Sequence, residues 1–155
     1  MQYRRLGRTN WQVSEMGYGM WGLASWTGGD KQEIDEALQR AVDLGCNFFD
    51  TAWAYAEGAS EKVLGDLVRR NTEKKLYVAT KVPPKNFKWP ALRSYKLEDC
   101  YPAAHIIDYT ERSLKNLKTD SVDLQQFHVW DDSWADHDEW KQAIDTLKQQ
   151  GKVKH

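Results

Sequence analysis

The chain contains few cysteines and prolines, and neither sign of charge dominates it. Of its 155 residues, two are cysteine (Cys46 and Cys100) and four are proline. Two cysteines are too few for a disulfide framework, so we expect a protein of the reducing cytoplasm. The 22 basic residues nearly balance the 23 acidic ones, which gives no electrostatic argument for binding nucleic acid or an anionic membrane surface.

Long apolar runs are missing as well. No stretch approaches the roughly 18 to 20 apolar residues that span a bilayer, and residues 1–5 do not start a secretion signal. We therefore expect neither a membrane partner nor a signal peptide before the fold. Tryptophan, in contrast, is abundant, with eight residues. Several follow predicted strand ends or lie in predicted loops, which suggests an aromatic-lined cleft, with core packing as the alternative for some of them.

After a short predicted hairpin, strands and helices alternate along the chain. The hairpin covers 3–13, and the predicted strands cover 14–20, 46–50, 76–80 and 122–127. Two predicted helices start at the N-caps Asp30 and Ser60, and two more cover 106–117 and 140–147. The helices show apolar residues at helical spacing, and Glu33 predicts a capping box with Asp30. This alternation predicts a parallel sheet with right-handed crossovers.

Two architectures fit a parallel sheet of this kind. A doubly wound dinucleotide-binding sheet is suggested by residues 17–22, which read G-x-G-x-x-G, and Asp50 could then bind the ribose. In that motif a helix starts at once, with its N-terminus against a pyrophosphate. Here the predicted helix starts only near Asp30, and the bulky Trp21 lies inside the supposed phosphate cradle. Half of an eight-fold barrel is therefore the favoured architecture.

The connection from residue 82 to about 102 is unusually long. It holds all four prolines and several aromatic residues, among them Phe87, Trp89, Tyr95 and Tyr101. Loops of this length in compact domains are often lids or binding loops. A disordered excursion is the alternative.

Four polar residues close or follow predicted strands: Asp50, Tyr55, Lys81 and His128. The carboxyl ends of successive parallel strands converge on one face of a (β/α) barrel, where active sites of that fold lie. A carboxylate, a phenol, an ammonium and an imidazole in one place can protonate a carbonyl oxygen. Each residue by itself has an ordinary structural explanation, but their common position favours a functional site.

Other candidate sites have simpler explanations. The acidic residues and His137 between 131 and 138 could suggest a metal site, but they flank a predicted helix N-terminus, where acids stabilise the helix dipole. We therefore expect no metal. Cys46 and Cys100 lack a nearby histidine or a C-x-x-C partner in the sequence, so neither is expected to be a nucleophile.

The order of several short motifs resembles that of the aldo-keto reductases. The matching segments are 3–9 with 13–14, 50–55 (D-T-A-x-x-Y), 60–65 (S-E-x-x-L-G), 80–82, 113–117 and 123–128. One departure is Ala56, where that family often has glycine. The resemblance implies a (β/α)8 TIM barrel, of which this chain supplies the N-terminal β-hairpin and about four βα units.

The resemblance also implies an activity, the NADP-dependent reduction of an aldehyde or ketone to an alcohol by hydride transfer. Tyr55 would be the general acid that protonates the small-molecule carbonyl substrate. Lys81 would ease proton release, because a neighbouring cation favours the phenolate. Asp50 would fix Lys81, and His128 would orient the carbonyl.

Further residues follow from the same resemblance. Gly19, Met20, Trp21 and Asp50 would bind NADPH/NADP+. Trp53 and Trp130 are expected in the substrate pocket from their positions. The alternative function is that of a non-catalytic barrel relative, which acts as a cofactor-sensing regulatory or interaction subunit.

The length raises one difficulty for this interpretation. A full barrel needs about 250 residues, whereas residues 1–155 provide about four βα units, and 151–154 resemble the start of the fifth strand. We therefore expect residues 1–155 to be the N-terminal half of a reductase barrel domain. If the half barrel were the true product, exposed strand edges could make it an oligomer.

Overall fold

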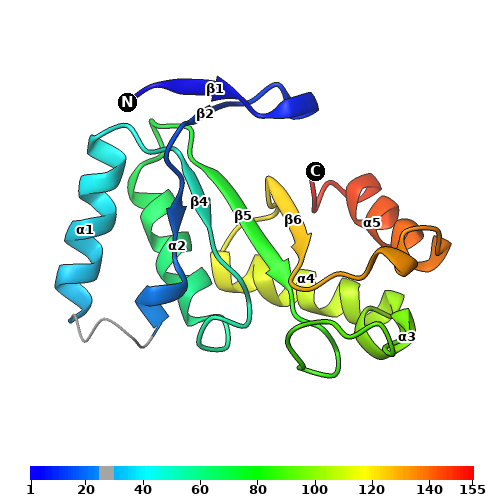
Figure 1. The fold of residues 1–155 in the computed structure, drawn as a ribbon. Helices are drawn as coiled ribbons and strands as arrows, with labels where there is room; N and C mark the ends of the chain where they lie inside the picture. The colour runs from blue at the N-terminus through cyan, green and yellow to red at the C-terminus, as the bar shows by residue number, and fades with distance from the viewer. Residues whose placement is uncertain (25–29) are drawn as a thin grey trace.

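The computed structural model of the protein describes residues 1–24 and 30–155 (Figure 1). Most of the loop predicted at 22–29 lies outside these ranges. The strands are β1 (Tyr3–Arg5), β2 (Gln12–Ser14), β3 (Tyr18–Gly19), β4 (Phe48–Asp50), β5 (Tyr77–Val82) and β6 (Leu124–Phe127). The α-helices are α1 (Lys31–Asp43), α2 (Ala59–Arg70), α3 (Leu97–Cys100), α4 (Ala103–Leu117) and α5 (Asp138–Gln149), and the 3-10 helices are η1 (Gly7–Thr9), η2 (Trp21–Ala24) and η3 (Asp132–Trp134).

Four strands form one parallel sheet in the order β3-β4-β5-β6. Strand order therefore follows chain order, whereas a doubly wound sheet reverses direction at a switch point. The G-x-G-x-x-G segment leads from β3 into the single turn η2, and the next α-helix starts only at Lys31. The helices follow one another around the sheet in the same order as the strands (Figure 1). This is part of a (β/α) barrel, as predicted, and the dinucleotide-sheet alternative is wrong.

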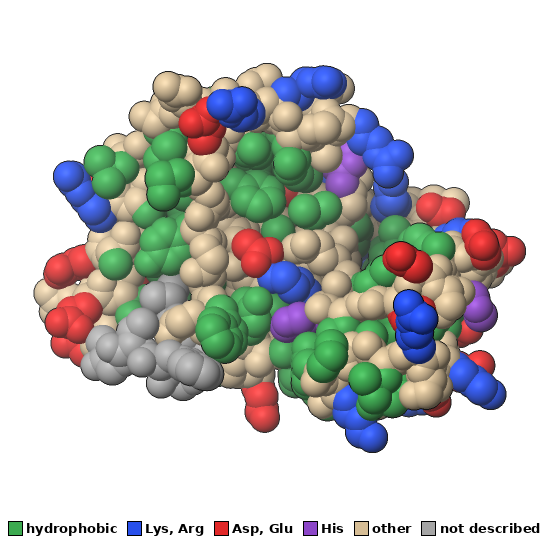
Figure 2. All heavy atoms as spheres, viewed as in Figure 1, with side chains coloured by type: hydrophobic (Ala, Val, Ile, Leu, Met, Phe, Trp, Pro, Cys, Tyr) green, Lys and Arg blue, Asp and Glu red, His purple; other side chains and the backbone are tan. Residues whose placement is uncertain are grey.

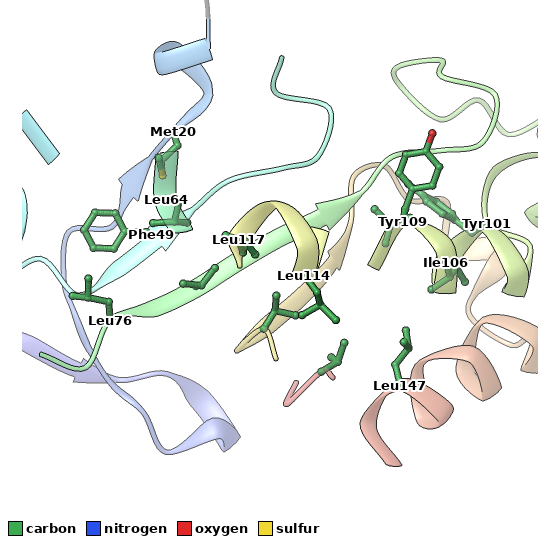
Figure 3. Packing of buried hydrophobic residues seen from close by; sticks show 14 of the residues in the cluster. Met20, Phe49, Leu64, Leu76, Tyr101, Ile106, Tyr109, Leu114, Leu117 and Leu147 are labelled. Carbon is green, nitrogen blue, oxygen red and sulfur yellow. The ribbon is translucent and has the colours of Figure 1, made fainter. Parts of the chain in front are cut away.

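The hydrophobic core fills the space between the sheet and the helices. Figure 3 shows Phe49 of β4 near Leu64 of α2, and Leu114 and Leu117 of α4 beside the neighbouring strands. These side chains are buried, and each fully buried leucine or phenylalanine contributes roughly 1.5 to 3 kcal/mol relative to exposure. The core therefore holds the strand ends in fixed relative positions.

The predicted N-terminal hairpin is confirmed, and it lies where β4 and β5 begin (Figure 1). Tyr3 donates a hydrogen bond to the Gly45 carbonyl (2.9 Å), and Asn47 donates to the Gln12 carbonyl (2.9 Å). Gly45, which accepts, and Asn47, which donates, both lie just before β4 in the chain. The opposite ends of the strands, where the polar residues lie, are thus left uncovered by the hairpin.

The start of α1 is as predicted. Glu33 N donates to Asp30 Oδ1 (2.9 Å), and Asp30 N donates to Glu33 Oε2 (3.2 Å), which completes the capping box. This reciprocal pair satisfies two backbone donors that the helix leaves without partners.

The start of α2 differs from the prediction. Its N-cap is Gly58, with φ +84°, and not Ser60, which lies inside the helix. The Ser60 hydroxyl is instead buried 2.8 Å from the Thr51 hydroxyl, and it donates to the Met20 carbonyl (3.2 Å). The expected cap is therefore wrong, because tertiary partners at two strand ends take the hydroxyl.

Glu61, the next residue of α2, is also fully buried. Its Oε1 accepts from the Thr80 hydroxyl of β5 (2.6 Å), and its Oε2 accepts from Asn116 of α4 (2.8 Å). Burial raises the pKa of the Glu61 carboxyl, and these two hydrogen bonds oppose that rise. Glu61 thereby joins two helices and a strand at one point.

The long connection after β5 folds against α3 and α4. Lys85 N donates to the Cys100 carbonyl (2.8 Å), and the His105 Nε2 atom lies 2.8 Å from the Pro83 carbonyl oxygen. The connection also contains the short helix α3. The structure thus agrees with an ordered loop and not with the disordered alternative.

Ala56 occupies a left-handed backbone conformation, with φ +48°. That conformation costs an L-residue about 1 kcal/mol that glycine avoids. We predict that Ala56→Gly raises the free energy of unfolding by about 0.5 to 1 kcal/mol, measured by urea denaturation. The matched control is Ala54→Gly, whose backbone is not left-handed, and it should lose about 0.5 kcal/mol because glycine adds unfolded-state entropy. Equal effects of the two substitutions would contradict the strain at Ala56.

Candidate active site

Lys81 lies at the centre of the polar group at the carboxyl ends of the strands. It is the penultimate residue of β5, which extends to Val82. Its Nζ donates to Asp50 Oδ2 (2.6 Å), to the Thr51 carbonyl (2.8 Å) and to the Tyr55 hydroxyl (3.4 Å). An ammonium has three donors, so each has an acceptor, and the lysine side chain is only 14% exposed. Lys81 is a fixed cation.

Asp50 ends β4 and uses both carboxylate oxygens inside the site. One accepts from Lys81, and Oδ1 accepts from Gln126 Nε2 (3.0 Å). Gln126 pairs with Lys81 in the register of β5 and β6. Sequence reasoning missed Gln126, although its position two residues before His128 puts both on the same face of the sheet.

Tyr55 comes from the loop between β4 and α2. Its ring centroid lies 5.1 Å from Lys81 Nζ and 5.5 Å from the ring centroid of His128, to which it is nearly perpendicular. The hydroxyl contact with Lys81, at 3.4 Å, is long for a hydrogen bond. The phenol therefore lies between the ammonium and the imidazole.

His128 follows β6, and its backbone N donates to the Val82 carbonyl (3.0 Å). The Nδ1 atom is buried and has no hydrogen-bond partner among the residues that the structure describes. Burial lowers the pKa of the imidazole, the Lys81 charge lowers it further, and Asp50 opposes both effects. His128 is therefore neutral at neutral pH.

The structure thus brings Asp50, Tyr55, Lys81 and His128 together, and we call them the tetrad. Acidic, basic and histidine side chains lie next to one another near the middle of the face in Figure 2, between hydrophobic ones. A carboxylate-held cation beside a phenol, with a neutral imidazole across from it, can deliver a proton to an oxygen that gains negative charge.

Gly19, Met20 and Trp21 lie next to the tetrad in different ways. Gly19 ends β3 and pairs with Asp50 in the sheet register. Met20 N donates to the Asp50 carbonyl (2.9 Å), but the Met20 side chain is fully buried in the core. Trp21 is 54% exposed. Burial thus keeps the Met20 side chain from a ligand at this edge, and contacts of Gly19 and Trp21 with a cofactor stay predictions.

The rings of Trp53 and Trp130 pack against aromatic rings outside the tetrad. The ring of Trp53 is 4.7 Å from that of Tyr109, and the ring of Trp130 is 5.5 Å from that of Trp140. Within the described ranges, neither has a ring contact with a tetrad residue, so their substrate role stays a prediction. Trp89 does contact the tetrad, with its ring 5.6 Å from that of His128.

The acidic segment before α5 provides capping contacts. Asp131 Oδ1 accepts from the backbone N (3.0 Å) and the hydroxyl (2.6 Å) of Ser133, at the start of η3. Among residues 1–24 and 30–155, no three His, Cys, Asp or Glu side chains are grouped so that they could hold a metal ion. No helix in the same ranges is both long enough and apolar enough to cross a bilayer.

Comparisons with known proteins agree with this geometry. The family model of the Aldo/keto reductase family matches residues 15–155. The chain is 29% identical to the aldo-keto reductase YhdN of Bacillus subtilis, over 99% of this chain and 45% of that protein. It is 32% identical to a probable voltage-gated potassium channel subunit beta of Arabidopsis thaliana, over 83% of this chain and 37% of that protein.

The fold also matches a solved structure. An aldo-keto reductase of Bacillus halodurans, in its holo form, superposes with a TM-score of 0.79 at 28% identity, over 100% of this chain and 49% of that one. The chain thus spans about half the length of the relatives that it matches. The predicted resemblance is confirmed: the chain belongs to the aldo/keto reductase family.

Proposed function

We propose that residues 1–155 are the N-terminal half of a barrel that reduces an aldehyde or ketone to an alcohol with NADPH. The observation that carries the proposal is the set of contacts of Lys81, which holds Asp50 with one donor and reaches the Tyr55 hydroxyl with another. Replacing a buried ion pair by apolar side chains is often neutral or stabilising, so stability alone gives little reason for a buried ammonium in this position. This supports a chemical role for Lys81.

The residues beside β3 suit the nicotinamide–ribose end of such a cofactor. The Asp50 side chain is 35% exposed, and each of its oxygens accepts one internal hydrogen bond, which leaves lone pairs for ribose hydroxyls. A side chain built on Gly19 would meet no described atom within 4 Å, so the space beside Asp50 is open. NADPH supplies the hydride when bound. Asp50, Gly19 and Trp21 would hold that end of it.

Tyr55 would supply the proton. The carbonyl oxygen gains negative charge as the carbon is reduced, and a donor placed at that oxygen stabilises the charge. The Tyr55 hydroxyl would donate the proton, and the Lys81 ammonium beside it would face the negative charge that remains on the oxygen. Asp50 keeps Lys81 in place during this step.

His128 would orient the substrate through its Nε2 atom. A neutral imidazole carries one N–H and one lone pair. The Nδ1 atom is buried without a partner among the described residues, and a buried donor without an acceptor is costly. The proton is therefore better placed on Nε2, where it can be donated to the carbonyl oxygen.

We predict that Lys81→Met lowers the turnover rate about a hundredfold, at the low end of acid–base contributions. The substitution removes the cation and leaves the Asp50 charge near the phenol, which disfavours the phenolate. The assay follows NADPH oxidation with a panel of aldehydes and ketones. It uses this chain and a fusion of this chain to the second half of the Bacillus subtilis relative.

The control for this experiment is Lys148→Met, an exposed lysine of α5, which should leave turnover unchanged. A folded fusion that binds NADPH but reduces none of the carbonyls would contradict the proposed function. Full activity of Lys81→Met in an active fusion would contradict the role of Lys81.

A second candidate is a regulatory or interaction subunit that senses the cofactor. The similarity to the Arabidopsis protein named as a probable potassium channel subunit beta favours it. Such a subunit would bind NADPH without steady carbonyl turnover. NADPH binding combined with no turnover in the fusion would therefore select this candidate.

A further inference from the structure

The imidazole of His128 lies between two aromatic rings. The Tyr55 ring is 5.5 Å away at 84°, and the Trp89 ring is 5.6 Å away at 79°. Both are edge-to-face arrangements, and such pairs contribute about 0.5 to 1.5 kcal/mol beyond the area they bury. Tyr55 belongs to the tetrad, whereas Trp89 comes from the loop between β5 and α3.

The two ring contacts are interactions on which the orientation of this imidazole can depend. Within the described part of the chain, Nδ1 of His128 has no hydrogen-bond partner. His105 provides the contrast, because its Nε2 lies 2.8 Å from the Pro83 carbonyl oxygen, which fixes its ring. A histidine without such a bond can rotate about its side-chain torsions unless neighbouring rings prevent it.

Trp89 is itself held in place, although it is 45% exposed. Its ring lies 6.2 Å from that of Phe87, and Phe87 lies 6.2 Å from Trp53. Asn86, three residues before Trp89, contacts α3, because its Nδ2 atom lies 3.4 Å from the Cys100 sulfur. The indole therefore contacts His128 from a loop that is held against α3.

We propose that Trp89 is a positioning residue, which fixes the orientation of the His128 imidazole toward the substrate carbonyl. The consequence for catalysis rests on the proposed function, whereas the orientation itself does not. Trp89 would act through His128 and need not touch the reacting atoms. The aromatic ring, and not bulk in general, is the property that matters.

The first test measures the four imidazoles by two-bond nitrogen–proton NMR, with His128 assigned through His128→Gln. In the parent chain we expect one tautomer for His128, and nuclear Overhauser contacts between its ring and Trp89. In Trp89→Leu we expect mixed tautomers and a titration midpoint closer to the usual 6.5, because water reaches the ring while Lys81 and Asp50 are unchanged. Trp89→Phe should resemble the parent.

Leu92→Ala is the matched control, an exposed residue of the same loop, and it should leave the His128 signals unchanged. An unaltered His128 spectrum in folded Trp89→Leu would overturn the proposal. If that variant fails to fold, the parent decides, because missing contacts between the two rings would overturn it equally.

The second test measures turnover in the fusion with the Bacillus subtilis half. We expect Trp89→Leu to lower kcat roughly tenfold, less than the hundredfold that a 1 Å misplacement can cost, and to leave the KM for NADPH unchanged. Trp89→Phe should restore most of kcat. If Trp89→Leu changes the His128 spectrum but the parent fusion is inactive, the positioning role is kept and the proposed function is rejected. The two failures are therefore distinguishable.

Discussion

Replacing Tyr55 with phenylalanine is expected to lower carbonyl reduction about a thousandfold and to leave the fold unchanged. The substitution removes only the hydroxyl, which is the group that faces Lys81 at 3.4 Å. General acid catalysis contributes about 10²- to 10⁴-fold, and the phenylalanine ring has no proton to donate to the carbonyl oxygen. The measurement is single-turnover hydride transfer in the fusion protein.

The design separates chemistry from packing. Phenylalanine keeps the ring that lies edge-to-face against His128, so the imidazole stays in place and affinity for NADPH should be unchanged. The control is Tyr95→Phe, a tyrosine of the loop before α3, which should react at the parent rate. Activity of Tyr55→Phe within about tenfold of the parent would show that another group donates the proton.

The second large effect is expected on stability, from Gly65→Ala. A Cβ built on Gly65 would lie 2.3 Å from the backbone oxygen of Leu117 and 2.7 Å from its carbonyl carbon. Overpacking typically costs about 1 to 3 kcal/mol, and here no side-chain rotation relieves the clash because the neighbour is backbone. We expect a loss of about 3 kcal/mol or more in the free energy of unfolding, measured by urea denaturation.

Gly19→Ala is the control for this prediction. A methyl group there meets no described atom within 4 Å, so the loss of stability should stay below about 1 kcal/mol. A Gly65→Ala protein as stable as the control would mean that α2 and α4 can separate without cost. The close approach of these helices would then not be a constraint on the fold.

The tetrad could be predicted from the sequence because its members depend on topology more than on detail. Once β4, β5 and β6 are parallel neighbours, the residues at their carboxyl ends must meet. Asp50 and Lys81 then pair without further information. Gln126 was predictable in principle from strand alternation, since it shares a face with His128.

Other features depend on contacts between distant segments, which a single sequence does not reveal. Ser60 has the residue type of an N-cap, but its hydroxyl finds Thr51 and Met20, and Gly58 caps the helix instead. Trp89 meets His128 through the path of its loop, which packs against α3 and α4. Local propensity cannot rank such alternatives, because the competing partner is tertiary.

The start of α2 has a consequence for how this site can evolve. Ser60 binds Thr51, the neighbour of Asp50, and Glu61 binds Thr80, the neighbour of Lys81. The spacing of Asp50 and Lys81 on the inner face of the sheet is thereby set from the face that the helices cover. The two residues that set it, Ser60 and Glu61, are buried where no substrate reaches them. Mutagenesis aimed at new substrates can thus vary loop residues other than Tyr55 and Trp89, whereas changes at 60 and 61 would alter the geometry of the reaction centre without contacting the substrate.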